Sequence, residues 1–457
     1  MVQHDTKSTA ISISESSAPL GSPNQEPDLR VGLAEGLDSA RLLLDGYFRL
    51  GSLTIEPGAY ELGAEGNEVA MVDDQGHLIA RAPELHLVPK EQSQCSFTLP
   101  KNSIGRDFHW QRHIRQTFRG ALAVRCFERG SITLINHIAL EDYLEAVVCS
   151  EMSPDASEEF LKAHCVISRS WVLAQLQPRT SDAGTETASW TDVGAHSHYD
   201  VCNDDHCQRY HGIGAVNAAA RSALATTRGE VLWSEGAVCD ARFSKCCGGI
   251  TEQFSTCWQD VDFSYLQPLP DCPPGKAEFA PPLTNEAAAR KFIDSRPQVF
   301  CNVSDPQLLE TILPDFDSET GDFFRWQVRY TQEELSKIIS DRSGKDFGDI
   351  LGLEPLQRGP SGRICSLRIV GSKCSQIVSK ELAIRHMLSS SHLYSSTFYV
   401  EKLSTGSVPH TFVLHGAGWG HGVGLCQIGA AAMAHSGHDY QQILAHYFQG
   451  TELKRLY

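Results

Sequence analysis

The stretch INHIALEDYLEAVVCSEM, residues 135–152, marks the point where the pattern of the chain changes from strand to helix. Its apolar residues recur three and four positions apart, which is the spacing of one face of an α-helix. These residues are Leu140, Tyr143, Leu144, Val147 and Val148. The pattern breaks around Ser153-Pro154. We therefore predict one short amphipathic helix that ends close to Glu151.

Strands are predicted on the N-terminal side of this helix. Between Leu29 and Asn136, short runs of alternating apolar residues are separated by Gly, Asp and Asn, which is typical of strands and turns. On the C-terminal side, a longer helix is predicted from Asp155, with Glu158 as its capping-box partner. Strands and helices interleave without a β-α-β rhythm, so we predict the α+β class.

The remaining elements are predicted from periodicity and from turn residues. A long loop is predicted over residues 177–200, a helix over Gly212–Arg228 and a Pro-rich connection over Pro268–Pro282. Further helices are predicted near Glu286–Asp294, Glu333–Ser340, Gln427–His435 and Tyr440–Phe448, and strands near Phe324–Tyr330, Ile364–Ile369 and Phe398–Val400. No repeat period is visible, which argues against solenoids and propellers.

Composition narrows the class of partner. Acidic residues outnumber basic ones by 56 to 39 in this chain of 457 residues, which argues against nucleic acid or an anionic membrane as the partner. No stretch reaches the ~18 consecutive apolar residues of a membrane-spanning helix, so no integral membrane segment is predicted. Residues 1–27 lack a charged start followed by an apolar run, so they do not resemble a signal peptide, and the segment 1–28 is predicted to be disordered.

The cysteine content leaves two interpretations open. Fifteen cysteines cannot all pair within one chain, so some must be free, bound to metal or bonded elsewhere. A disulfide framework is the rival interpretation, but such frameworks mostly stabilise short secreted domains that lack a large core.

Four ordered segments carry a family resemblance. They are INHIALEDYLEAVVCSEM at 135–152 with AHCVISRSW at 163–171, AHSHYDVCNDDHCQRY at 195–210, ARFSKCCGGITE at 241–252, and HGAGWGHGVGLCQIGAAAM at 415–433 with YQQILAHYFQGTEL at 440–453. Together they resemble the SpoIID/LytB family, from about Leu29 to the last residue. The Cys246-Cys247 pair departs from the family pattern, which usually has small hydroxyl residues there.

The resemblance implies a catalytic body with a substrate cleft. By position it makes Glu151 the catalytic acid and implicates Arg169 in the active site. It implies a β-rich part at 29–136, a catalytic and metal-binding part at 137–283, and a part at 284–457 that completes the cleft. The flanking Glu145 is predicted to be a solvated residue on the exposed side of the helix.

A metal site is predicted in the second segment. His196, Cys202 and Cys207, with His198 and His206 nearby, supply enough soft sulfur and imidazole ligands for zinc. The Cys-x4-Cys spacing alone is equally compatible with a local disulfide. Zinc in some members of the family favours the metal, and a structural role is the simpler expectation.

The third and fourth segments are predicted to face a saccharide. Gly248 and Gly249 allow close approach of a sugar to the main chain beside Ser244, although an ordinary Gly-Gly turn is the simpler alternative. In the fourth segment, His421 and Gln427 are predicted to contact sugar, and Trp419 offers a face for stacking.

The implied reaction is cleavage of the peptidoglycan glycan strand between N-acetylmuramic acid and N-acetylglucosamine by a lytic transglycosylase. Ordinary glycosidases need two carboxylates, and these segments present no clear partner for Glu151, which favours ring closure by the sugar's own hydroxyl over hydrolysis. The partners that the resemblance implies are peptidoglycan glycan strands and other wall hydrolases. The alternatives are a non-catalytic amidase enhancer and a zinc hydrolase centred on His196, Cys202 and Cys207.

Overall fold

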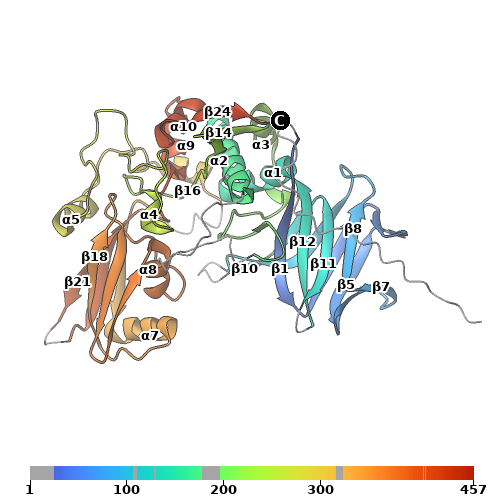
Figure 1. Cartoon of the computed structure of the whole chain (residues 1–457), viewed down its shortest axis with the longest axis horizontal. Coiled ribbons are helices and arrows are strands. Elements are labelled where there is room, and N and C mark those ends of the chain that lie inside the picture. Colours follow the sequence, from blue (N-terminus) through green and yellow to red (C-terminus); the bar gives the residue numbers. More distant parts are fainter. Residues whose placement is uncertain are drawn as a thin grey trace, which may run out of the picture.

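The computed structural model describes residues 25–106, 111–127, 130–177, 196–314, 323–404, 406 and 408–457. Its helices and strands interleave along the chain, which confirms the α+β class. The predicted disordered segment 1–28 and the predicted loop 177–200 lie mostly outside the described residues. Figure 1 shows two strand-rich parts with a group of helices between them.

The N-terminal part is built from two sheets among the described residues. The first has the order β13 (Val201–Cys202), β1 (Asp28–Leu37), β12 (Ser131–Ala139), β11 (Ala121–Phe127), β8 (Glu84–Pro89), β3 (Phe48–Leu50) and β4 (Leu53–Ile55). The second has the order β10 (Arg112–Phe118), β9 (Ser96–Ile104), β2 (Ser39–Asp45), β5 (Gly58–Glu65), β6 (Glu68–Asp73) and β7 (Leu78–Ala82). Apolar side chains such as Val31, Leu42 and Phe97 are fully buried in the shared core.

Three helices follow the first sheet. Helix α1 (Leu140–Glu151) begins directly after β12, and α2 (Glu158–Leu176) packs against both α1 and α3 (Ala218–Thr226). The predicted start of α2 was wrong, because the Ser157 hydroxyl, not Asp155, caps the helix by accepting the Phe160 N–H. The helix predicted over Gly212–Arg228 is a single 3₁₀ turn at Ile213–Ala215 followed by α3.

The C-terminal strand-rich part has its own apolar core, which includes Trp326, Phe347, Ile369 and Phe398. Its sheets are β17 (Arg325–Thr331), β22 (Thr411–Ala417) and β21 (Phe398–Leu403), and β18 (Ile350–Arg358), β19 (Ile364–Gly371) and β20 (Ser375–Ser379). Its helices are α7 (Gln332–Ser343) and α8 (Glu381–Met387), and the connection to it carries α4 (Phe254–Cys257), α5 (Glu286–Asp294) and α6 (Pro306–Ile312). The strands and helices predicted here are confirmed within one or two residues, apart from longer ends of α7 and β21.

The last segment returns the chain to the central helices. A parallel pair joins β16 (Phe243–Ser244) to β23 (Leu425–Cys426), and α9 (Gln427–His435) and α10 (Tyr440–Tyr447) follow as predicted. Strand β24 (Glu452–Arg455) then pairs with β14 (Glu230–Ser234), which also pairs with β15 (Ala237–Val238). No helix in the described part of the chain has the length and apolar character needed to cross a membrane.

Candidate functional site around Glu151

Glu151 is the last residue of α1. The helix stops there because Met152 adopts an extended conformation and Pro154 follows two residues later. The Glu151 side chain is largely buried, with the residue 8% exposed. Its carboxylate Oε1 accepts a hydrogen bond of 2.8 Å from the backbone N–H of Arg209. No hydrogen bond from the described part of the chain reaches Oε2.

The loop that supplies this N–H runs along the last turn of α1. The His211 N–H donates to the Ser150 hydroxyl at 3.0 Å, and the Tyr210 hydroxyl donates to the Asn136 side chain at 2.7 Å. Gln208 joins the loop to both helices, since its side chain bonds to the Tyr143 hydroxyl at 3.3 Å and to the Ser168 carbonyl at 3.3 Å. The position of the Glu151 carboxylate therefore depends on the conformation of residues 208–211.

The same loop holds the predicted metal ligands. One ligand atom each from His196, Cys202 and Cys207 lies within 4.8 Å of the other two. Cys207 Sγ is 3.4 Å from His196 Nε2, and bond lengths of zinc to sulfur and nitrogen place such ligands about 3.5 Å apart in a tetrahedron. The Cys202 N–H donates to Cys207 Sγ at 3.4 Å, as expected of a thiolate ligand held by the backbone. The donor set fits zinc.

The other two histidines of the segment lie outside this group. His198 stacks on Phe127, with ring centroids 3.8 Å apart, and His206 is exposed. All fifteen cysteines lie in the described part of the chain, and none of them forms a disulfide. The disulfide interpretation of the Cys-x4-Cys spacing therefore has no counterpart in the structure.

A second carboxylate, Asp205, lies beside Glu151 and was missed from the sequence. Its Oδ1 accepts 2.7 Å from Arg209 Nε, so that one residue, Arg209, bonds to both acids. Its Oδ2 is buried and receives no hydrogen bond from the described residues. Burial and the charges of Asp204 and Glu151 raise the pKa of Asp205 to about 7, even though Arg209 opposes the shift. Asp205 lies between Cys202 and Cys207 in the sequence, and its acidic side chain was the one local signal of a role.

Arg169 does not contact Glu151. It is fully buried and forms a two-point ion pair with Glu141, with Nε and Nη2 at 2.8 and 2.7 Å from the two carboxylate oxygens. Glu141 lies at the start of α1, ten residues or about 15 Å before Glu151. Arg169 is thus a positioning residue for the beginning of the helix.

The prediction that Glu145 is solvated was wrong. The residue is 7% exposed, and its carboxylate bonds to Arg119 at 2.9 Å and to Arg221 at 2.6 Å. The helical spacing places it on the side of α1 that α3 covers, which the local sequence does not reveal.

Lys245 connects the third segment to helix α1. Its Nζ donates 3.0 Å to the Glu151 carbonyl, so β16 and the end of α1 are held together. Ser244, one residue earlier, is buried and accepts the Gly422 N–H at 3.1 Å. The third and fourth segments therefore meet directly behind Glu151.

The glycines of the third segment contact the protein's own chain. A Cβ added to Gly248, at φ 79°, would lie 2.8 Å from the Gly418 nitrogen, and one added to Gly249 would meet the Phe292 ring at 3.4 Å. Both are buried, and the close approach predicted for a sugar is used for internal packing.

The three predicted sugar contacts of the fourth segment differ in how deeply they are buried. Gln427 is buried and bonds to His164 at 3.0 Å, so its amide faces the core and not a ligand. His421 is packed edge-on against Trp258 and its Nδ1 accepts the Val423 N–H. Trp419 is half-buried and stacks on Tyr394 with ring centroids 4.2 Å apart, so one face of its indole packs against the protein's own chain.

Comparison with known proteins shows a similarity over this part of the chain. Residues 128–233, which carry Glu151, Arg169 and the His196 loop, match the family model described as Stage II sporulation protein. Stage II sporulation protein D of Bacillus amyloliquefaciens is 23% identical over 327 residues, covering 70% of this chain and 75% of that protein. Residues 128–233 of the chain therefore form a SpoIID-like region.

Other relatives extend the similarity beyond the SpoIID region. The amidase enhancer of Bacillus subtilis is 24% identical over 321 residues, and the chain spans 40% of its length. An uncharacterised protein of Brachyspira hyodysenteriae is 25% identical over 323 residues, which is 71% of this chain and 68% of that protein. Residues 252–424 match a domain of unknown function (DUF8618), so a large part of the chain outside the SpoIID region has no assigned role.

Proposed function

We propose that this protein cleaves the glycan strand of peptidoglycan as a lytic transglycosylase, with Glu151 as its acid and base. The observation that carries the proposal is the Glu151 carboxylate at the end of α1, mostly buried and fixed by one backbone N–H on Oε1. Among the described residues, only Oε1 of this carboxylate accepts a hydrogen bond. A largely buried carboxyl group with its other oxygen available is suited to giving and receiving a proton.

The proposed reaction uses Glu151 twice. It first donates a proton to the glycosidic oxygen that follows N-acetylmuramic acid, as the bond from that oxygen to C1 breaks. It then accepts the proton of the same sugar's 6-hydroxyl, whose oxygen bonds to C1 and closes the 1,6-anhydro ring. The attacking hydroxyl belongs to the substrate, so proximity replaces a water-activating base.

Zinc, held by His196, Cys202 and Cys207, is proposed as a structural ion. Bound there it would neutralise the two thiolates and lock the loop, with a fourth position open to water. Arg209 follows Cys207 by two residues, so the residues that hold the ion also set the N–H that orients Glu151.

The test is product analysis with the full chain and purified glycan strands, with and without stem peptides. Mass spectrometry should detect 1,6-anhydro-muramyl ends, and Glu151→Gln should abolish them. Glu158→Gln is the matched control, because Glu158 is exposed at the start of α2 and should leave the products unchanged. Products that persist in Glu151→Gln would overturn the assignment.

Asp205 makes hydrolysis the second candidate. A second carboxyl group beside the acid is what a hydrolase uses to activate water or to attack the sugar. Digestion in ¹⁸O-water separates the two reactions, because hydrolysis places ¹⁸O on the new reducing end and ring closure incorporates none. Asp205→Asn should leave anhydro products unchanged if the transglycosylase assignment is right.

The name of the Bacillus subtilis relative gives the non-catalytic alternative. A wall-binding amidase enhancer would release no glycan products by itself and would raise the rate of a separate wall hydrolase. Wild-type chain that gives no product while stimulating a purified amidase would replace the transglycosylase assignment.

A further inference from the structure

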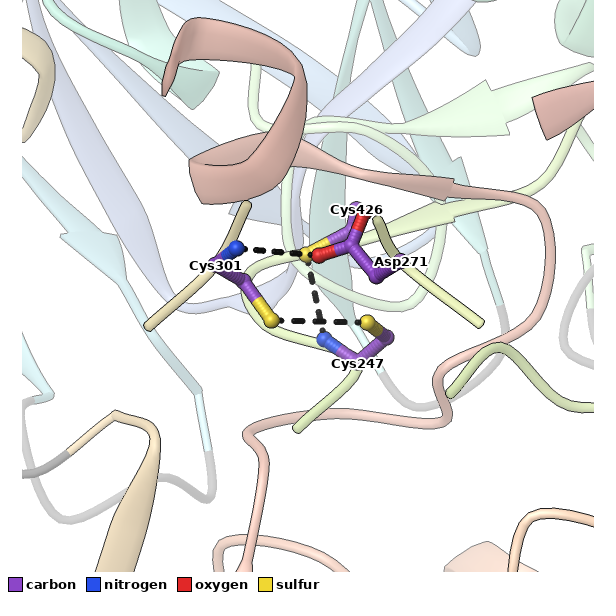
Figure 2. Close-up of side chains that lie close together, drawn as sticks. All are labelled: Cys247, Asp271, Cys301 and Cys426. Carbon is purple, nitrogen blue, oxygen red and sulfur yellow. Dashed lines mark hydrogen bonds between the residues drawn. The ribbon is translucent and has the colours of Figure 1, made fainter. Parts of the chain in front are cut away.

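A second group of metal-ligand side chains lies in the core, away from the His196 loop. It consists of Cys247, Asp271, Cys301 and Cys426, all of them buried. Figure 2 shows the four side chains converging from four separate segments. Cys247 follows β16, Asp271 lies in the Pro-rich connection, Cys301 follows α5, and Cys426 ends β23. Their sequence separations hide the group from any motif search.

The distances match one tetrahedral ion. One ligand atom from each of the four residues lies within 4.8 Å of all the others. Cys247 Sγ and Cys301 Sγ are 3.6 Å apart, and zinc–sulfur bonds of about 2.3 Å place two sulfurs about 3.8 Å apart in a tetrahedron. A disulfide would hold them at about 2.05 Å. The spacing therefore corresponds to two ligands of a shared ion and not to a bonded pair.

The surrounding hydrogen bonds are those of ligands held in place. The Cys247 N–H donates to Cys426 Sγ at 3.2 Å, and the Gly249 N–H donates to Cys247 Sγ at 3.3 Å. The Asp271 carboxylate accepts the Cys301 N–H at 3.0 Å and the Tyr447 hydroxyl at 2.7 Å. Donors to sulfur and to the carboxylate orient these ligands and stabilise their charged forms.

The surroundings could also offset the charge of a bound ion's ligands. With an ion bound, three thiolates and a carboxylate would place four negative charges in the core, which is costly unless they are compensated. The guanidinium groups of Arg325 and Arg363 lie nearby, bonded to the Gly248 carbonyl at 2.9 Å and to the Cys247 carbonyl at 3.2 Å. His446 Nε2 is 3.8 Å from Asp271 Oδ1. A divalent ion would leave about two negative charges for these groups to offset.

We propose that Cys247, Asp271, Cys301 and Cys426 bind one zinc ion as a closed structural site. Soft sulfur ligands select zinc over magnesium or calcium, and four protein ligands leave no open position for catalysis. The site supports the catalytic helix from behind. Cys247 is two residues from Lys245, which bonds to the Glu151 carbonyl, and Cys426 pairs with Ser244 across the β16–β23 contact.

The test is the zinc content of the full-length chain, measured by native mass spectrometry and elemental analysis. Wild type should bind two zinc ions, Cys301→Ser one, Cys207→Ser one, and the double variant none. Cys239→Ala is the control, because Cys239 is equally buried but belongs to neither group, and it should retain both ions. These counts do not depend on glycan cleavage, so the site and the proposed function fail separately.

X-ray absorption at the zinc edge gives a second measurement in case Cys301→Ser does not fold. It measures the average number of sulfur ligands per zinc ion. This number should rise in Cys207→Ser, because that variant loses the ion with two sulfur ligands and keeps the ion with three. Wild type with a single zinc ion that Cys207→Ser removes completely would overturn the proposal. So would a native mass lower by two hydrogens with Cys247 linked to Cys301.

Discussion

At the scale of single residues, His164 in the second turn of α2 is a polar side chain that is buried in the core. It is 1% exposed, its Nδ1 lies 3.1 Å from the Ser168 hydroxyl, and its Nε2 lies 3.0 Å from the Gln427 amide nitrogen. The amide nitrogen can only donate, so Nε2 must be the unprotonated acceptor. Burial, together with the nearby Lys245 charge, lowers the pKa of His164 to about 3.

This shift predicts a loss of stability in acid. The unfolded chain takes up a proton at its ordinary pKa near 6.5, whereas folded His164 stays neutral until about pH 3, so stability is complete above pH 6.5 and falls as the pH decreases. Between pH 7.5 and pH 5 this residue should cost about 2 kcal/mol of unfolding free energy, at about 1.4 kcal/mol per pH unit below 6.5. Denaturant unfolding at several pH values measures it.

The comparison variant is His164→Gln, which keeps an amide for both hydrogen bonds and cannot titrate. Subtracting its pH profile from that of wild type isolates His164 from the other buried histidines. Parallel profiles for the two proteins would contradict the neutral, buried assignment.

The residues of the candidate site differ in how far sequence could find them. Glu151 and the His196, Cys202 and Cys207 set lie in short local motifs, and the structure brings each set together. Asp205 was missed because its position beside Glu151 depends on Arg209, which donates hydrogen bonds to both carboxylates. Cys301 and Asp271 were missed because 30 residues separate them and no local spacing records the contact.

At the scale of elements, helix α1 is held at both ends by partners distant in sequence. Its first turn is fixed by the ion pair of Glu141 with Arg169, which also bonds the Glu230 carbonyl at 3.0 Å, and by the Tyr457 hydroxyl at 2.6 Å from Glu141. Its last turn is fixed by the Arg209 N–H and Lys245. Contacts with distant segments therefore fix both ends of the helix that carries Glu151.

Arg169→Ala should lower the free energy of unfolding by about 3–5 kcal/mol, because it leaves the Glu141 carboxylate buried without its partner. The double variant Glu141→Gln/Arg169→Met should be more stable than Arg169→Ala, since no buried charge remains. Denaturant unfolding of the three proteins measures this coupling.

Activity separates positioning from catalysis. If Arg169 acts only through α1, the double variant should keep glycan cleavage wherever it is folded. A double variant that is folded yet inactive would place Arg169 in the catalytic machinery instead.

The bounds of an element were predicted correctly where local sequence determines them, and wrongly where contacts with another element determine them. Helix α9 was predicted at its true bounds because a run of small residues ends before Gly437, whose φ is 92°. The start of α2 was misplaced because Asp155 and Ser157 are both good caps, and Asp155 is instead contacted by the Asn217 amide at 3.2 Å. Packing against α3 thus selected between two equal local signals.

At the scale of the whole molecule, the chain has a core shared by the N-terminal sheets and central helices and a second core in the β17–β22 part. Figure 1 shows the second part on the left, away from helix α1, which carries Glu151. Both proposed zinc sites belong to the first region, since Cys202 and Cys247 contact its core or its first sheet. The apolar side chains of the sheet β18–β19–β20 pack on the second core, and β19 also contacts α4 of the connecting segment.

Removing metal should therefore loosen one region and spare the other. After treatment with a strong chelator, hydrogen exchange measured by mass spectrometry should rise in residues 201–211, around Cys247 and around Cys301. Exchange in β19 beyond its first residues should stay unchanged, because its backbone pairs with β18 and β20 and its apolar side chains belong to the second core. Restored zinc should reverse the rise. A uniform increase through β19 would mean that the two cores unfold as one unit, and an unchanged 201–211 loop would mean that no ion holds it.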